Sequence, residues 1–151
     1  MTNPIEYTVK VYSNGSKAWY LNGQRHREDG PAIELADGSK EWYLNGKLHR
    51  EDGPAFEYSS GYKAWYLYDV LHREDGPAVE LADGSKQWYL NGKLHREDGP
   101  AVEYTDGDKY WYLNGNELTE EKFNTRMNPV AKELTIGEIE NLLGYSIKVV
   151  K

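Results

Sequence analysis

The sequence predicts a mainly β fold: an elongated single-layer antiparallel sheet of tandem β-hairpin repeats with a small helical cap at the C-terminal end. First, a Trp-Tyr-Leu triplet recurs every 23 residues, at Trp19, Trp42, Trp65, Trp88 and Trp111. Second, Asp-Gly and Asn-Gly pairs, which favour tight turns with positive φ, recur within that period. Third, short segments of alternating character lie between the turns. Such units stack into a linear array in which each contacts only its neighbours.

The array is expected to begin with a hairpin that departs from the later copies. Residues 8–13 read Thr-Val-Lys-Val-Tyr-Ser, a segment rich in β-branched and aromatic residues. Asn14-Gly15 is a strong hairpin signal, and a second strand is predicted over residues 17–21. A terminal repeat faces water on one side, so a different sequence is expected there.

Each later unit is predicted to contain two strands and a connector, as in the copy at residues 32–54. The strands cover Ala32–Ala36 and Lys40–Leu44, and Asp37-Gly38 forms the turn between them. The connector, Asn45–Pro54, begins with an Asn-Gly pair that ends the second strand. It closes with a Gly-Pro pair that stops strand pairing, because proline has no N–H to donate.

Alternation along the second strand assigns its side chains to two faces. Lys40, Trp42 and Leu44 are predicted on one face, and Glu41 and Tyr43 on the other. Two strands per unit advance the array by about 10 Å. The tryptophans should therefore form a ladder in which each ring is buried by its neighbours, and the tyrosines should form a second ladder that could cover a partner.

One unit breaks the repetition. Residues 34–58 and 80–104 are the same sequence except at two positions, but the unit between them replaces both turn sequences. Neutral drift explains this change, because turns tolerate substitution. The alternative is that the central unit anchors a partner, since tyrosine is enriched among residues that dominate binding energy. The partner-binding residues predicted on this hypothesis are Tyr62, Tyr68, Asp69, Val70, His72, Arg73 and Glu74.

A second module is predicted after the repeats. The array spans residues 1–115, with five units, and residues 116–151 form a helix-helix-strand module that caps its C-terminal edge. Thr119 caps a first helix that ends at Asn128-Pro129. A capping box starts a second helix at Thr135, and Gly144 ends it. Residues 145–150 read as a strand.

Composition limits the classes of function. The formal net charge of −7 disfavours direct contact with nucleic acid or an anionic membrane and favours a partner with a basic surface. The absence of cysteine excludes disulfides and thiolate chemistry. The sequence shows neither a membrane span nor a signal peptide, so we expect a cytoplasmic protein.

These motifs resemble a known family. The 23-residue period, the Asp-Gly hairpin, the Trp of the second strand and the Asn-Gly-Lys-x-His connector resemble MORN repeats. They are closer still to the MORN-like repeats of antitoxin-type, phage and large-virus proteins. The resemblance covers residues 9–115 and implies a single-layer sheet that acts as a scaffold or docking surface. This chain has His-Arg-Glu-Asp-Gly where MORN units usually carry His-Gly-x-Gly, so lipid or dimer contacts tied to those glycines do not carry over.

The His-Arg-Glu-Asp motif, present four times, has three interpretations. An enzyme would need further motifs, such as a Cys pair for a zinc deaminase or a glycine loop for a kinase, and none is present. Neighbouring histidines about 10 Å apart are too distant to share a metal ion, although a site within one connector stays open. The favoured interpretation is structural, with the histidines satisfying backbone groups and each arginine paired with a nearby acid.

The function expected is therefore non-enzymatic binding of one protein partner, with no cofactor and no metal. The favoured variant is a phage or mobile-element inhibitor of a host defence or nucleic-acid-processing protein, acting in the host cytoplasm. A DNA mimic is disfavoured, because lysine and arginine in every unit dilute the negative field. The alternatives are an antitoxin that neutralises a toxin, or a scaffold that dimerises through its sheet edge or its C-terminal module.

Overall fold

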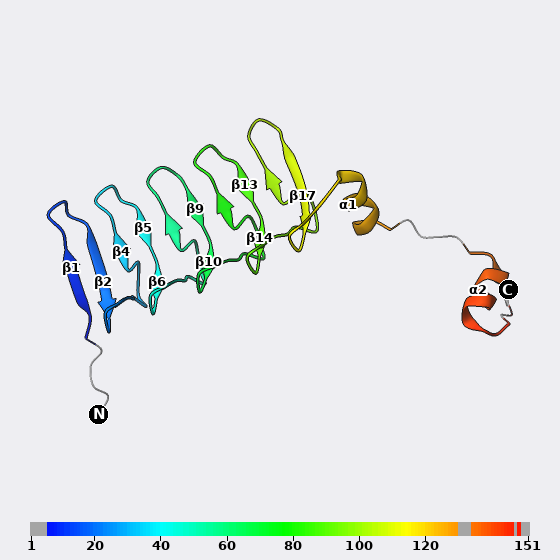
Figure 1. Ribbon diagram of the computed structural model, residues 1–151, viewed down its shortest axis with the longest axis horizontal. Helices are drawn as coiled ribbons and strands as arrows, with labels where there is room; N and C mark the ends of the chain where they lie inside the picture. Colours follow the sequence, from blue (N-terminus) through cyan, green and yellow to red (C-terminus); the bar gives the residue numbers. More distant parts are fainter. Residues whose placement is uncertain (1–5, 130–133, 147, 149–151) are drawn as a thin grey trace, which may run out of the picture.

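The structure, a computed structural model, describes residues 6–129, 134–146 and 148. It is one long antiparallel sheet with two short helices near the C-terminus, which confirms the predicted fold class (Figure 1). The main sheet has 12 strands, counting β3 (Gln24–Arg25), which pairs with β2 beside the main path. Along that path the order is β1 (Thr8–Val11), β2 (Lys17–Leu21), β4 (Ile33–Glu34), β5 (Lys40–Glu41), β8 (Phe56–Glu57), β9 (Lys63–Ala64), β12 (Val79–Glu80), β13 (Lys86–Gln87), β16 (Val102–Glu103), β17 (Lys109–Leu113) and β18 (Asn116–Leu118).

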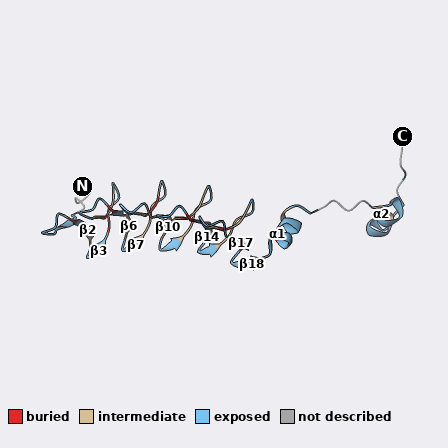
Figure 2. Cartoon of the chain, turned by 90° about the horizontal axis from the view of Figure 1, so that it is seen from above, coloured by how far each residue is buried: buried red, intermediate tan, exposed pale blue. Residues whose placement is uncertain are grey.

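The sheet is a single layer. Seen from above in Figure 2, the strands form a thin row, and no described element covers either face. The accessible surface is 10554 Å². That is about a third more than the roughly 7,900 Å² expected for a compact folded chain of this mass. Both faces are therefore available for contacts.

Hydrogen bonds between turns join successive units at the end of the strands where the Asp-Gly turns lie. In the Asp-Gly turn of the second unit, the Ser39 backbone N–H donates to Asp37 Oδ1 at 2.9 Å. The buried Ser39 Oγ then accepts from the Ser59 backbone N–H of the next unit at 3.0 Å. Ser16 Oγ accepts from the Ala36 N–H in the same way, at 3.0 Å. These side chains set the register between units.

The Asn-Gly pair ends the second strand with positive φ, as predicted, but the prediction of two strands per unit is wrong, because the chain turns back at this pair as a further strand. In the second unit the pair turns the chain into a second hairpin, in which β6 (Tyr43–Leu44) pairs with β7 (Lys47–Leu48). Asn45 has φ 50° and Gly46 has φ 79°, as a type I′ turn requires. The same hairpin recurs as β10 (Tyr66–Leu67) with β11 (Val70–Leu71) and as β14 (Tyr89–Leu90) with β15 (Lys93–Leu94).

The reason for the second hairpin lies in contacts between units. The strand breaks at Trp42, whose backbone N–H donates to Ala55 O of the next unit at 2.8 Å. The Arg27 N–H of the preceding connector donates to Tyr43 O at 3.1 Å. Local sequence does not show these contacts, because the partners lie in other units. In the first unit the Trp19 N–H makes the same bond to Ala32 O, and β2 stays unbroken from Lys17 to Leu21.

The predicted alternation of faces is confirmed. Glu41 and Tyr43 share a face, and the Tyr43 hydroxyl donates to Glu41 Oε2 at 3.1 Å. Trp42 lies on the opposite face, where the Arg50 guanidinium stacks on its ring at 4.0 Å. Glu57, which is paired with Lys40 across the sheet, accepts from Arg50 on this same face.

The predicted tryptophan core is wrong. The tryptophan side chains are only half-buried, and the fully buried positions are small residues. The alanine after each connector proline is 0% exposed in all four copies, namely Ala32, Ala55, Ala78 and Ala101. A single-layer sheet has no facing layer, so an indole ring keeps one side accessible. Small side chains are the ones that lose all contact with water, as at these four alanines and at Ala64.

Helix α1 (Glu120–Met127) covers the C-terminal edge of the sheet. Thr119 caps it as predicted, with Oγ1 accepting from the Lys122 N–H at 3.3 Å. Phe123 is 3% exposed on the side of α1 that lies against β17 and β18. Strand β18 itself, which the sequence assigned to the C-terminal module, is the last strand of the sheet.

Helix α2 (Ile136–Leu143) has the predicted capping box between Thr135 and Glu138, and Gly144 ends it with φ 73°. None of its residues is buried. The predicted strand over 145–150 includes residues 147, 149 and 150, which lie outside the described residues. Tyr145 and Ser146 are not in a strand.

Candidate protein-binding surfaces

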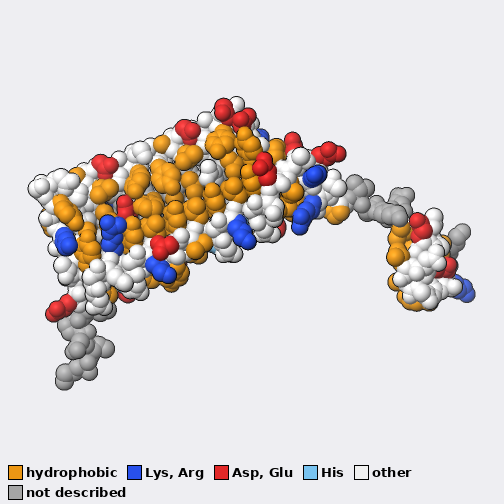
Figure 3. Space-filling view, viewed as in Figure 1, with side chains coloured by type: hydrophobic (Ala, Val, Ile, Leu, Met, Phe, Trp, Pro, Cys, Tyr) orange, Lys and Arg blue, Asp and Glu red, His pale blue; other side chains and the backbone are white. Residues whose placement is uncertain are grey.

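One face of the sheet is built almost entirely of aromatic and aliphatic side chains. Cross-strand pairing places Ala18, Ile33, Phe56, Val79 and Val102 on this face. Figure 3 shows it as a continuous hydrophobic band along the array with few charged side chains. We call it the tyrosine face. Its aromatic residues are Tyr12, Tyr20, Tyr43, Phe56, Tyr58, Tyr62, Tyr66, Tyr89, Tyr104, Tyr110 and Tyr112.

Ring contacts and one half-buried acid, Glu41, hold these aromatic side chains in place. The Phe56 ring lies 5.4 Å from Tyr58 and 5.8 Å from Tyr66, both edge-on. The Tyr58 hydroxyl donates to Glu41 Oε1 at 3.2 Å. Burial, and then the charge of Glu41, raise the pKa of Tyr58 to about 12. The face thus presents neutral, ordered rings.

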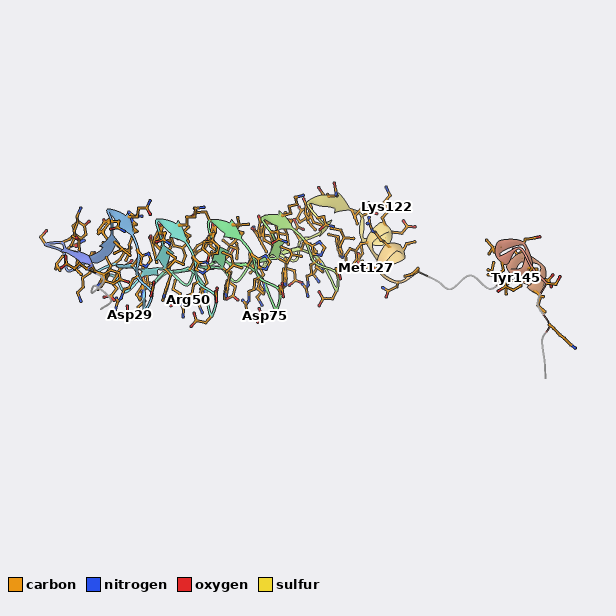
Figure 4. The ribbon with its side chains drawn as sticks, turned by 90° about the horizontal axis from the view of Figure 1, so that it is seen from below. Asp29, Arg50, Asp75, Lys122, Met127 and Tyr145 are labelled. Carbon is orange, nitrogen blue, oxygen red and sulfur yellow. The ribbon has the colours of Figure 1, made fainter. Side chains whose placement is uncertain are left out.

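The opposite face carries the connectors, and we call it the connector face. Each connector arginine stacks on a tryptophan, as Arg50 does on Trp42. The Arg50 Nε–H donates to Asp52 at 2.8 Å and its Nη1–H donates to Glu57 at 2.9 Å. The same Nη1 also reaches Pro54 O at 3.3 Å. Figure 4 shows Asp29, Arg50 and Asp75 along one side of the array.

The arginine has an electrostatic effect on the connector acids. A hydrogen bond from the arginine, together with its charge, lowers the pKa of the connector aspartates below the usual range; they are Asp29, Asp52, Asp75 and Asp98. The favoured structural interpretation of His-Arg-Glu-Asp agrees with this geometry, since the arginine is already bound by an aspartate of its own unit and a glutamate of the next.

The connector glycine provides room for the stacked arginine. A Cβ built on Gly53 would lie 2.7 Å from Arg50 Cζ. The same contact in the fourth connector, between Gly99 and Arg96 Cζ, would be 3.1 Å. These glycines have no positive φ, so glycine is needed here for space and not for backbone conformation.

Three of the four connector histidines link their unit to the next. His26 Nδ1 accepts from the Asn45 backbone N–H at 3.0 Å, and its Nε2 lies 3.5 Å from Glu28. The corresponding Nδ1 contacts join His72 to Asn91 at 3.2 Å and His95 to Asn114 at 3.0 Å.

The central unit lacks two of these links between units. His49 Nδ1 is buried without a hydrogen-bond partner, and Tyr68, which stands where the other units have asparagine, stacks on the His49 ring at 4.0 Å. In three other units a turn serine Oγ accepts a hydrogen bond from a backbone N–H of the next unit. Tyr62 stands at this serine position, and no hydrogen bond joins the described residues Tyr62 and Ala82. Tyr68 and Asp69 have φ 51° and 68°, although neither is glycine or asparagine. Asp69 Oδ1 accepts from the Leu48 N–H at 2.8 Å.

The structure places the predicted partner-binding residues in three different regions. Tyr62 lies on the tyrosine face, where its ring contacts Tyr58 at 5.7 Å. The second turn holds the exposed side chains of Tyr68, Asp69 and Val70. The connector face holds His72, Arg73 and Glu74, with Arg73 stacked on Trp65 at 4.0 Å. These residues do not form one site, and their role in binding stays a prediction.

Sequence reasoning did not single out Tyr58, Tyr104 and Tyr110, which are among the most exposed rings of the tyrosine face. A signal was present, because Tyr58 and Tyr104 occupy the same position in the 46-residue duplication. Their exposure depends on which face remains uncovered, and only the structure shows this.

Two further findings bear on function. Within residues 6–129, 134–146 and 148, no cluster of three or more His, Asp and Glu side chains is arranged to hold a metal ion. Neither described helix has the length and apolar character needed to cross a membrane.

The comparisons with known proteins give no family for this chain. No protein-family model matches it, and no curated protein is significantly similar to it.

Proposed function

We propose that this protein is a non-enzymatic binding module whose tyrosine face docks one protein partner. The observation that supports this proposal is the continuous aromatic band in Figure 3. Soluble monomers rarely expose contiguous apolar patches beyond a few hundred Å². With five units about 10 Å apart and aromatic segments of about five residues, some 15 Å long, across each unit, the band covers roughly 750 Å². A stable protein–protein interface buries about 800 Å² on each partner.

The chemistry of the face indicates what kind of partner it fits. Charged side chains on it are few, and Glu41 is already bound by the hydroxyls of Tyr43 and Tyr58. The rings are held by one another, so little side-chain entropy is lost on binding. The partner is therefore a folded protein that presents a flat apolar surface with polar groups to meet the tyrosine hydroxyls.

Within this function, we retain the inhibitor role favoured by the sequence. A small, cysteine-free, acidic chain that binds one protein fits a stoichiometric inhibitor of a defence or nucleic-acid-processing protein, with a toxin as the alternative partner. The activity of the isolated partner, measured with increasing amounts of this chain, tests that role. Inhibition should saturate at one chain per partner.

The docking surface is tested by photo-crosslinking followed by binding measurements. p-Benzoylphenylalanine at Tyr104 should crosslink the partner, which is then purified for affinity measurement. Tyr58→Ser with Tyr104→Ser should weaken its binding by at least about 2 kcal/mol, a loss typical of aromatic hot spots. The control, Tyr7→Ser with Tyr145→Ser, removes two exposed rings outside this face and should leave affinity unchanged.

Two results would overturn the proposal. Equal affinity of both double variants would place the binding site elsewhere. Crosslinks from Tyr104 to a second copy alone would mean that the face mediates self-association and not partner docking.

One observation favours the edge-to-edge scaffold as a second candidate. All four residues of β1 are exposed, with Val9 and Val11 among them, and its outer edge pairs with no described strand. An open edge can pair with another chain. Light scattering should then show a dimer that Val9→Pro abolishes, because proline at an edge position removes a ladder donor.

A further inference from the structure

The connectors enclose a series of grooves on the face opposite the tyrosine face. One groove, of about 680 Å³, is lined by Trp42, Leu44 and residues of the first and second connectors. Another, of about 630 Å³, is lined by Trp88, Leu90 and residues of the third and fourth connectors. The repeat places Trp65 at the corresponding position between them. The grooves thus combine aromatic and aliphatic surface with a highly charged rim.

Each rim carries more negative than positive charge. Each connector arginine is bound by an aspartate and by a glutamate of the sheet, as Arg50 is by Asp52 and Glu57. The connector glutamates remain mostly exposed, at 82% for Glu51 and 83% for Glu74. Within the part of the chain that the structure describes, the one basic group within 4.0 Å of each of these carboxylates is a histidine Nε2, at 3.7 Å.

A lysine or arginine side chain fits this combination of groups. Its aliphatic stem can lie on the tryptophan and leucine, while its cationic head reaches the glutamates at the rim. Arginine suits the site better, because its guanidinium also stacks on indole rings. The chain uses this same chemistry within each unit, where Arg50 lies over Trp42.

The spacing of the grooves selects the conformation of the ligand. With two sheet strands per unit, successive grooves lie about 9.6 Å apart. A polyproline II segment repeats every three residues, over about 9.3 Å, with side chains on one side. A β-strand returns to the same side every two residues, about 6.7 Å, which does not match. An α-helix does so only every seven residues, over about 10.5 Å, and drifts out of register along the array.

We propose that the connector face binds an extended basic segment of a protein, with one arginine or lysine at every third residue entering successive grooves. This surface is distinct from the tyrosine face, so the inference does not depend on the function proposed above. The segment runs along the array and crosses the rims of successive connectors.

Fluorescence anisotropy with labelled peptides tests the spacing. One peptide carries three arginines at every third residue, with proline and alanine elsewhere. Two further peptides have the same composition but arginines at every second or every fourth residue. An alanine-rich peptide carries them at every seventh. The peptide with every-third spacing should bind at least about tenfold more tightly than the others, since only its charges all meet a rim.

A pair of matched variants tests the location. Glu51→Gln with Glu74→Gln should weaken binding of that peptide at least about fivefold, because each removes an exposed carboxylate from a rim. Asp108→Asn with Glu121→Gln removes the same charge from exposed positions that line neither groove. This control should change affinity less than twofold, because only the net charge of the protein changes.

Equal affinity for all four peptides, or an equal loss of affinity in both double variants, would show that binding depends only on net charge. Either result would overturn the proposal. Tightest binding by the every-seventh peptide would mean that a helix and not an extended segment occupies the connector face.

Discussion

At the scale of single residues, the central unit shows what the Asn-Gly turn contributes in the other units. A type I′ turn needs positive φ at both central positions, which asparagine and glycine tolerate at little cost. Tyr68 and Asp69 adopt this conformation against their preference. They also leave His49 Nδ1 without the partner that His26 has in Asn45. Strain of this kind persists only where the surrounding structure imposes it.

We predict that Tyr68→Asn stabilises the protein by about 1 kcal/mol. Asparagine tolerates the left-handed conformation, which gains about 1–2 kcal/mol. The restored histidine contact adds about 1 kcal/mol. Loss of the Tyr68–His49 stack costs about 0.5–1.5 kcal/mol. Urea unfolding measures the change. The reverse substitution at the equivalent position, Asn91→Tyr, should destabilise by a similar amount. A stabilised Asn91→Tyr variant would show that the stack outweighs the turn.

At the scale of the elements, the connector works as one cooperative unit. The arginine guanidinium links its parts: it stacks on the tryptophan, lies beside the glycine, and donates hydrogen bonds to the connector aspartate and to the strand glutamate. The Gly-Pro pair was predicted to stop strand pairing. The structure adds that the glycine also leaves space for the arginine of its own connector.

A double-mutant cycle tests this coupling. Gly53→Ala should destabilise by about 1–2 kcal/mol, because its Cβ displaces the Arg50 guanidinium from the Trp42 ring. In an Arg50→Ala background, Gly53→Ala should cost less than about 0.5 kcal/mol, since nothing remains to be displaced. Thermal unfolding of the four proteins gives the coupling energy. Additive losses would mean that the glycine serves another purpose.

At the scale of the whole molecule, the chain is a one-dimensional array with different ends. Each unit bonds only to its neighbours through turn serines, connector histidines and tryptophan N–H groups. The C-terminal edge is covered by α1, with Phe123 buried, while the outer edge of β1 is unpaired among the described strands. Stability in such an array is approximately a sum over units and the contacts between them.

We predict that deleting residues 80–102, one full period, leaves a folded protein. The deletion joins Val79 to Glu103 and so restores the Val-Glu sequence of β16 in the same register. Small-angle scattering should show a particle about 10 Å shorter, with an unchanged circular dichroism signal per unit. Loss of cooperative unfolding would contradict a modular array.

The sequence by itself determined the repeat, the antiparallel hairpins, the alternation of faces and the caps of both helices. These features depend on local chemistry: turn residues set φ, β-strand geometry sets alternation, and a capping box closes on itself between Thr135 and Glu138. The tertiary structure alone decided the rest. It split the second strand at the tryptophan in the three middle units, made small alanines the buried core, and left the tyrosine face open. It also separated Tyr62, Tyr68 and His72 into three regions. These outcomes depend on hydrogen bonds and packing between residues of different units, and a single-layer sheet buries only what a neighbouring unit covers.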